Sequence, residues 1–438
     1  MTAGTDGKQP SGDKAATGNL GNDLRGVGKI AIDATTAITS LVEAMHRGIT
    51  RPLSRNDDAG TGAGGIAGLV YSSVRGITRG VGFGVDAALK LLAPALRDVA
   101  DVRGRDSVQS IINGAMGDYL QRSGNPLAIE MQWRAAGQGL AMDPVAIARA
   151  LGHVSGKLLI MVHGLCMNDL RWQRNSEGGS HDHGAALQRD LDYTAVYLRY
   201  NTGLHIATNG RQLSQALEAL VGAWPVPVES ITIVAHSMGG LVARSACRCG
   251  DDTSAVWRTR LRKLAFLGTP HAGAPLERGG RWLVSVIGST PYAAPLARLG
   301  RLRSAGITDL RYGSVCEEDW QNSDRFETDE ASVHPLPLPT DVDCYAIGGT
   351  LGRTTDDLKG RLLGDGLVPV ASALGQHDDA RRALAFPPSH TAVLPSTDHL
   401  QLLGAPAAYA ALRSFLGGHT SGDQAREYAA SVNPKEKT

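Results

Sequence analysis

The sequence lacks any long run of charge of one sign, and this absence bears on its partners. Its 438 residues hold 44 Lys and Arg against 43 Asp and Glu, so the formal net charge is only +1. Proteins that bind nucleic acid usually carry clustered basic residues. The composition therefore predicts no nucleic-acid partner.

Cysteines in regular pairs are also missing. The five cysteines are scattered along the chain, and their number is odd. This pattern predicts reduced thiols in an intracellular protein and not a disulfide framework. Cys247 and Cys249 form the single close pair, and we do not expect them to bind a metal.

The start of the chain has no apolar segment of the kind that forms an export signal. Residues 1–22 are mainly small and polar, which predicts a disordered N-terminus. Without an export signal, we expect a cytoplasmic protein. Peripheral contact with an inner lipid surface stays open as an alternative.

Amphipathic helical patterns follow over residues 23–150, and we predict a helical extension there. Apolar residues recur with helical spacing in three segments, 27–49, 66–99 and 108–120. The second series repeats about every eleven residues, which keeps one apolar stripe on a nearly straight helix. Four charged residues interrupt every window of the about 20 residues that a membrane-spanning helix needs: Arg75, Arg79, Asp86 and Lys90. The helices either pack on protein or lie flat on a lipid surface.

The pattern changes at Lys157 to short apolar runs that alternate with helical segments. This alternation predicts an α/β fold with a mostly parallel sheet and helices on both faces. The expected strands are residues 158–162, 195–198, 231–235, 264–267, 344–347 and 392–394. We predict a catalytic domain over 151–419, interrupted by a cap at about 274–340, and a flexible tail over 420–438.

Ser237 is the candidate nucleophile because it lies between an expected strand and an expected helix. A serine on such a sharp turn needs small residues two positions before and two after it. Ala235 and Gly239 occupy these positions. A glycine-rich helix N-terminus that binds an anion is the structural alternative.

A carboxylate and an imidazole must accompany a serine nucleophile. Asp365 lies in a Gly-Asp-Gly turn after the expected strand 344–347, and His399 follows the strand 392–394. Catalytic groups of parallel sheets gather at the carboxyl ends of strands, so these two residues are preferred over their rivals. The rival acids are Asp341, Asp343 and Asp398, and the rival bases are His163, His377 and His390.

The oxyanion hole of such an enzyme needs two backbone N–H groups near the serine. We expect one from Met238, the residue after the nucleophile. The other is assigned to Leu165, which follows the first expected strand in His163-Gly164-Leu165.

Together these motifs resemble the bacterial lipase and esterase branch of the α/β-hydrolases, close to its PGAP1-like group. The resemblance covers about residues 155–415 and is carried by His163-Gly164-Leu165, residues 236–240, residues 268–273 and residues 365–369. It implies the α/β-hydrolase fold, the chain order Ser237, Asp365, His399, and ester hydrolysis without an organic cofactor. It also implies an apolar acyl pocket under a mobile lid.

Some lipases of this branch hold a structural metal, and His181-Asp182-His183 is the segment to consider. The preferred interpretation is that Asp182 caps a helix beginning near Gly184. We therefore predict no metal and no cofactor.

The leading functional hypothesis is a carboxylesterase or lipase that forms an acyl-enzyme on Ser237 and acts on an acyl ester or lipid. Apolar residues in the cap, at 282–287, favour a medium or long acyl chain. A depolymerase of an intracellular polyester or lipid granule is an alternative enzyme. A lipid-surface binding protein that uses the hydrolase fold as a scaffold is an alternative from another class. The oligomeric state stays open.

Overall fold

A computed structural model describes residues 102–176, 179–274, 304–320, 333–354, 360 and 363–417. The chain divides into two compact units, and one of them, Asp101–Ser289 with Ala297–Thr438, contains every described element. The predicted disordered start, the helical patterns at 27–49 and 66–99, the apolar cap residues 282–287 and the predicted tail lie outside the described residues.

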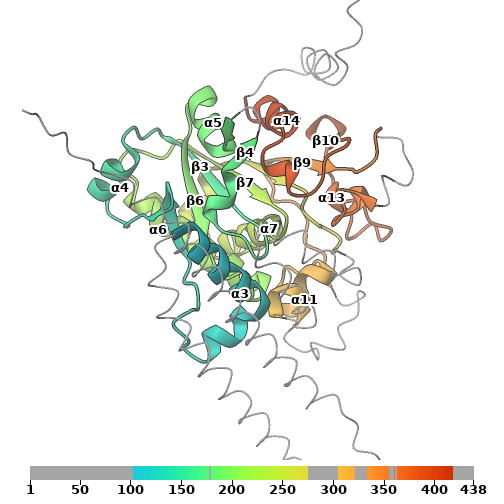
Figure 1. Cartoon of the computed structure of the whole chain (residues 1–438), viewed down its shortest axis with the longest axis horizontal. Helices are drawn as coiled ribbons and strands as arrows, with labels where there is room; N and C mark the ends of the chain where they lie inside the picture. Colours follow the sequence, from blue (N-terminus) through green and yellow to red (C-terminus); the bar gives the residue numbers. More distant parts are fainter. Residues whose placement is uncertain are drawn as a thin grey trace, which may run out of the picture. The chain divides into compact units, whose positions relative to one another are not determined.

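The described residues form a main sheet of eight strands in the order β10-β9-β8-β7-β3-β6-β1-β2 (Figure 1). The strands from β10 to β6 pair in parallel, whereas β1 and β2 are antiparallel. The predicted α/β fold with a mostly parallel sheet is thereby confirmed. The strands are β1 (Gln132–Ala135), β2 (Gln138–Gly139), β3 (Lys157–Val162), β6 (Thr194–Arg199), β7 (Ser230–His236), β8 (Leu261–Leu267), β9 (Asp343–Gly349) and β10 (Thr391–Leu394). A separate hairpin joins β4 (Arg174–Ser176) and β5 (Gly179–His181).

Helices surround this sheet, and 3₁₀ turns lie in several loops. The described α-helices are α3 (Val102–Arg122), α4 (Pro144–Leu151), α5 (His183–Leu191), α6 (Ile206–Ala223), α7 (Met238–Asp252), α8 (Val256–Arg260), α11 (Ala305–Tyr312), α13 (Val370–Ala373) and α14 (Pro406–Gly417). The 3₁₀ turns are η1 (Asp169–Trp172), η4 (Glu317–Asp319), η6 (Pro388–His390) and η7 (Gln401–Leu403). Among these described helices, none has both the length and the apolar character needed to cross a bilayer.

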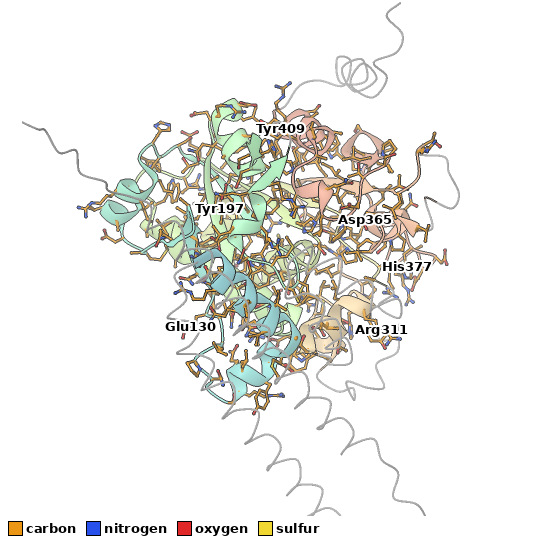
Figure 2. All side chains as sticks on the ribbon, in the orientation of Figure 1. Glu130, Tyr197, Arg311, Asp365, His377 and Tyr409 are labelled. Carbon is orange, nitrogen blue, oxygen red and sulfur yellow. The ribbon has the colours of Figure 1, made fainter. Side chains whose placement is uncertain are left out.

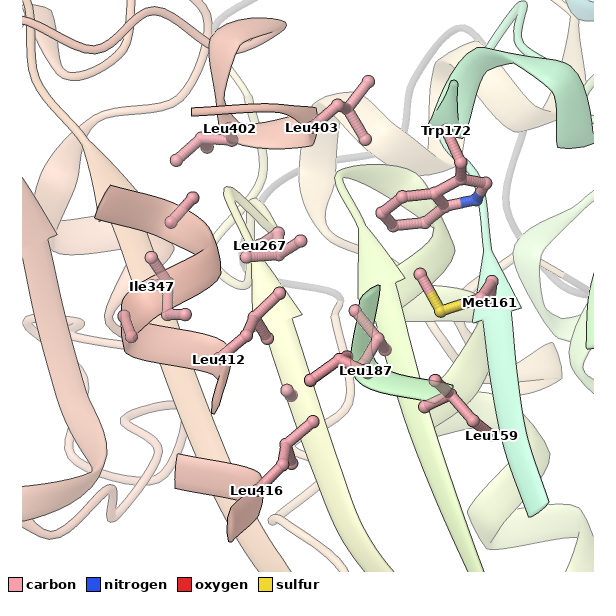
Figure 3. Close-up of a cluster of buried hydrophobic side chains, with 14 of the residues drawn as sticks. Leu159, Met161, Trp172, Leu187, Leu267, Ile347, Leu402, Leu403, Leu412 and Leu416 are labelled. Carbon is pink, nitrogen blue, oxygen red and sulfur yellow. The ribbon is translucent and has the colours of Figure 1, made fainter. Parts of the chain in front are cut away.

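The central strands are mainly apolar because helices cover both of their faces. Successive side chains of a strand point to opposite faces. One face packs against α5 and α14 in a cluster that includes Leu159, Leu187 and Leu412 (Figure 3). Each such fully buried side chain stabilises the fold by about 1.5–3 kcal/mol. This packing fixes the carboxyl ends of the strands, where the candidate site lies.

The other face packs against α7, which follows the candidate nucleophile. A Cβ placed on Gly240 would lie 2.8 Å from Cδ1 of Phe266, so α7 lies directly on β8. Next to it, α6 packs on α7, with Gly210 against Ser245. α6 begins at Ile206.

A buried ionic network joins α3 and β1 to the rest of the sheet. Arg134 of β1 lies 3.1 Å from Asp106 of α3 and 3.3 Å from Asp169 of η1. Arg199 of β6 lies 3.3 Å from Asp106. Burial of the network raises the pKa of Asp169 and lowers that of Arg199. These ion pairs join α3 and β1 to the strands of the same compact unit, and the domain boundary at residue 151 stays a prediction.

Part of the predicted cap, residues 304–320, is described, and it packs on the domain. Ser304 Oγ donates to the carbonyl of Gly114 at 2.7 Å, and the Gly306 amide donates to the carbonyl of Gly203 at 3.1 Å. Asp309 of α11 accepts the amide of Ile206 at 2.8 Å and so caps α6 from another segment. The extent of the cap stays a prediction, since most of its residues lie outside those described.

Candidate active site

Ser237 lies in a strained turn between β7 and α7. Its φ of 55° and ψ of −127° fall outside the conformations that non-glycine residues commonly adopt. Its amide donates to the carbonyl of Leu267 at 2.8 Å, and its carbonyl accepts the amide of Gly240 at 3.0 Å. Strain of this kind persists only where the surroundings hold it, and it is common at functional sites.

The small residue predicted two positions after Ser237 is required by close packing. A Cβ on Gly239 would lie 2.6 Å from the carbonyl oxygen of His163 and 2.7 Å from that of Val162. Any side chain at this position would therefore push α7 away from β3. Ala235, two positions before the serine, is fully buried in β7.

Asp365 and His399 lie together at the carboxyl end of the sheet, after β9 and β10. Asp365 Oδ2 accepts the Nδ1–H of His399 at 2.7 Å, and the Asp365 carbonyl accepts the His399 amide at 3.0 Å. Both side chains are almost completely buried. Figure 2 shows Asp365 beside β9 and α13. The contact fixes the proton of the imidazole on Nδ1 and leaves Nε2 as the basic nitrogen.

The turn around Asp365 holds the carboxylate in this orientation. Its other oxygen, Oδ1, accepts the amides of Leu367 at 3.0 Å and Val368 at 2.8 Å. The amides of the two residues after Gly366 thus hold one carboxylate oxygen, and the other oxygen faces the imidazole.

The site of Ser237 and the site of the Asp365–His399 pair adjoin each other. His236, the residue before Ser237, contacts His399 with a distance of 4.6 Å between ring centroids. A Cβ on Gly268, at the end of β8, would lie 3.1 Å from both Asp365 Oδ2 and His399 Nδ1. The three residues predicted as a triad therefore gather at one end of the sheet. Their catalytic roles stay a prediction.

The two residues predicted to supply the oxyanion hole are near Ser237 in different ways: Met238 follows it in sequence, and Leu165 follows Gly164, which packs against it. A Cβ on Gly164 would lie 2.9 Å from Cβ of Ser237, which places the segment before Leu165 against the serine. Met238 is the first residue of α7, where amides have no partner within the helix. Within the described part of the chain, neither the Leu165 nor the Met238 amide has a protein acceptor. Both can therefore donate to a ligand.

The loop that carries Leu165 is held by residues that the sequence patterns did not indicate. Cys166 has a φ of 59°, and its amide donates to Oγ1 of Thr202 at 3.2 Å. The Met167 amide donates to the carbonyl of Gly164 at 3.3 Å. The sequence analysis did not predict that Thr202 or Gly268 contacts the site, although Gly268 belongs to the 268–273 motif.

The rival acids have other partners or positions. Asp341 and Asp343 precede β9 or begin it, at the opposite end from Asp365. Asp398 Oδ1 accepts the amides of Leu400 and Gln401 and so starts η7.

The rival bases are likewise engaged elsewhere. His390 Nδ1 donates to the carbonyl of Cys344 at 3.1 Å, and His377 Nδ1 accepts the amide of Asp379 at 2.9 Å. His163 donates Nδ1–H to the carbonyl of Gly164 at 2.9 Å, and burial lowers its pKa to about 4. His163 therefore stays neutral, and its Nδ1 proton is held by the Gly164 carbonyl.

The segment His181-Asp182-His183 is a capping structure. Asp182 is the N-cap of α5, and its Oδ1 accepts the amide of Ala185 at 3.1 Å and the hydroxyl of Tyr197 at 2.7 Å. His183 Nε2 donates to the carbonyl of Leu402 at 2.9 Å, so its Nδ1 accepts from His181 Nε2 at 2.7 Å. The helix-cap interpretation is confirmed. No group of three or more metal-ligating side chains occurs within the described residues.

We expect Gly268→Ala to lower both stability and turnover. Gly268 has a φ of 57°, and the new methyl group would press on the Asp365–His399 pair. The left-handed backbone alone costs an alanine about 1–2 kcal/mol. Urea unfolding and kcat for a soluble ester measure the two effects. The matched control is Gly222→Ala, in exposed helix with no atom within 4 Å of the new Cβ; equal loss in both variants would contradict the prediction.

Comparison with known proteins finds a family that is similar to part of the chain. Residues 153–331 match the family described as PGAP1-like alpha/beta domain. No curated protein matches the sequence. The mature lipase BlEst2 of Bacillus licheniformis is 16% identical, with 61% of this chain and 94% of that chain covered and a TM-score of 0.37.

Two other solved structures are similar at the same level. Aspergillus fumigatus lipase B is 13% identical, with 66% of this chain and 61% of that chain covered and a TM-score of 0.37. A lipase-esterase related protein from Clostridium acetobutylicum is 13% identical, with 60% and 95% covered and a TM-score of 0.31. Over residues 153–331 the chain is thus similar to a PGAP1-like α/β domain, in agreement with the mostly parallel sheet of the structure.

Proposed function

We propose that this protein hydrolyses carboxylic esters through an acyl-enzyme on Ser237. The observation that carries the proposal is the 2.7 Å contact between Asp365 Oδ2 and His399 Nδ1, next to a serine in a strained turn. This contact leaves the Nε2 lone pair of His399 free to accept a proton. The family match of residues 153–331 supports the same reaction class.

In the acylation step, His399 Nε2 takes the proton of the Ser237 hydroxyl as Oγ attacks the ester carbonyl. The carbonyl oxygen gains negative charge and accepts the Leu165 and Met238 amides. Collapse of this intermediate breaks the bond to the alcohol, which leaves with the proton from His399. Asp365 holds the imidazole in the required tautomer and stabilises its charged form.

In the deacylation step, a water molecule takes the place of the alcohol. His399 removes one proton from the water as its oxygen attacks the acyl carbon, and the same two amides stabilise the oxyanion. The acid is released when Ser237 recovers its proton from His399. The proposed scheme uses only side chains and backbone amides of this chain.

The substrate class is proposed to be an ester with a medium or long acyl chain. The side chains beside the candidate oxyanion hole are apolar and buried, namely Leu165, Met167 and Met238. A Cβ on Gly306 would lie 3.0 Å from Cε of Met238, so α11 of the cap segment borders the site. An apolar surround of this kind favours a hydrocarbon chain over a charged substrate.

The acyl-chain profile tests this proposal directly. We expect kcat/KM for p-nitrophenyl esters to rise from C2 toward C8 or longer chains, because each buried CH₂ contributes up to about 0.8 kcal/mol. Measurement from C2 to C16 below the micelle concentration separates the pocket from surface effects. A profile that falls steadily from C2 would reject the long-chain substrate while keeping the esterase. No turnover of any ester would reject the esterase itself.

The alternative hypotheses depend on the N-terminal helical patterns, which lie outside the described residues. Docking on a polyester or lipid granule, or on a membrane surface, therefore stays a prediction from the sequence.

A further inference from the structure

His236 is a fully buried imidazole that the reaction scheme above leaves without a role. It is the last residue of β7 and directly precedes Ser237. Its neighbours include His399, with ring centroids 4.6 Å apart, and Trp172, with ring centroids 6.4 Å apart. A Cβ on Gly164 would lie 3.3 Å from its Nδ1. The ring is therefore enclosed by the segments that build the site.

One hydrogen bond joins this imidazole to the candidate base. His236 Nε2 lies 3.0 Å from the backbone carbonyl oxygen of His399. A carbonyl oxygen can only accept, so Nε2 of His236 carries the proton and donates. The bond spans 163 positions in the sequence and links the strand of the nucleophile to the loop of the base.

The backbone of His399 is thereby held on both sides of its Cα. Its amide donates to the carbonyl of Asp365, and its carbonyl accepts from His236. The side chain is held by Asp365 through Nδ1. Asp365 thus fixes the base with respect to β9, whereas His236 fixes it with respect to Ser237.

We propose that His236 is a positioning residue, which sets the place of the His399 imidazole relative to the Ser237 hydroxyl through the hydrogen bond to the His399 carbonyl. The proposal rests on the proposed function, because it assigns His236 a part in the same proton transfer. A shift of about 1 Å between reacting groups can cost about 100-fold in rate. The hydrogen bond from His236, which directly precedes Ser237, links Ser237 to His399 through few bonds. Its loss should therefore lower kcat.

Burial is consistent with this assignment. It lowers the pKa of His236 well below the usual histidine value, so the ring stays neutral. A neutral imidazole with its proton on Nε2 donates one hydrogen bond to the carbonyl without introducing a charge beside the base.

The test uses three substitutions of His236 in the full chain. Glutamine places an amide NH₂ about where Nε2 lies, asparagine places one nearer Nδ1, and leucine removes the donor. Each variant is assayed for kcat and KM with p-nitrophenyl butyrate at a temperature below its measured melting point. The matched control is His390→Leu, because His390 also donates to a carbonyl of another segment but lies in η6, directly before the first residue of β10.

We expect His236→Leu and His236→Asn to lose about 10- to 100-fold in kcat with little change in KM. His236→Gln should recover most of this loss, and His390→Leu should keep the kcat of the wild type. Equal kcat values for the glutamine and asparagine variants would overturn the proposal. A loss that appears in KM alone, or an equal kcat loss in His390→Leu, would also overturn it.

Assays of the wild-type protein separate failure of the proposed esterase function from failure of the positioning role of His236. Failure of the wild type to hydrolyse the ester and to react with a fluorophosphonate would reject the proposed function. A reactive wild type with unaffected His236 variants would reject the positioning role alone.

Discussion

Ser237→Ala is expected to lower kcat for p-nitrophenyl esters by about four to six orders of magnitude. The substitution removes the oxygen that forms the acyl-enzyme and leaves no second nucleophile at the turn. Alanine is no larger than serine, and the strained backbone at φ 55° already holds a residue with a Cβ atom. The fold should therefore persist. Loss of covalent labelling by a fluorophosphonate provides an independent measurement.

The control for this variant is Ser214→Ala. Ser214 is also a buried serine, but it lies in α6 and accepts the indole N–H of Trp257 at 3.1 Å. Its removal should cost about 1 kcal/mol of stability and leave turnover unchanged. Turnover by Ser237→Ala at the rate of this control would rule out the acyl-enzyme mechanism.

Asp365→Asn is expected to lower kcat by about 10⁴-fold while the protein stays folded. Two backbone amides, from Leu367 and Val368, donate to Oδ1 of Asp365 and will hold the oxygen of the asparagine amide in the same place. The NH₂ group must then face His399 Nδ1, which can only respond by accepting. The imidazole would carry its proton on Nε2 and could not take one from Ser237.

Asp398→Asn is the matched control for the acid. Asp398 neighbours His399 in sequence, yet its carboxylate accepts only the amides that begin η7, and an asparagine oxygen can replace it there. We expect the control to keep near wild-type kcat, and circular dichroism of both variants to match the wild type. If both variants keep the wild-type kcat, or both lose it to the same extent, Asp365 is not the acid of the triad.

The strand and helix that flank Ser237 could be predicted because their sequence patterns involve only neighbouring residues. β7 is mainly apolar between Ile231 and Ala235, and the small residues Ala235 and Gly239 lie within two positions of Ser237. The parallel strands β3, β6, β8, β9 and β10 were also recognised from apolar runs, since parallel strands are buried on both faces.

The hairpin β1–β2 was not predicted because its burial depends on distant partners. Arg134 reads as a surface residue in sequence, but it is buried by ion pairs with Asp106 and Asp169. The turn is Ala136-Gly137, with φ of 49° and 77°, and alanine gives little indication of such a conformation. Its pairing with β6 could be known only from the fold.

The candidate site also combines residues that the sequence predicts with contacts that only the structure shows. The residue types and their chain order predicted Ser237, Asp365 and His399. The hydrogen bond from the His236 side chain ends on the backbone carbonyl of His399, a distant segment, and a backbone acceptor leaves no pattern in the residue types. The same holds for Gly268, whose contact with the acid and the base appears only once β8, β9 and β10 lie side by side.

The buried ion pairs of α3 limit how many N-terminal residues can be removed without loss of stability. Residues 153–331, which match the family, include Arg199 and Asp169 but neither Asp106 nor Arg134. Removing one partner of a buried ion pair costs about 3–5 kcal/mol, which is a large share of a domain's stability. A truncated protein intended for expression should therefore start ahead of α3, although the recognisable family signature begins only after it.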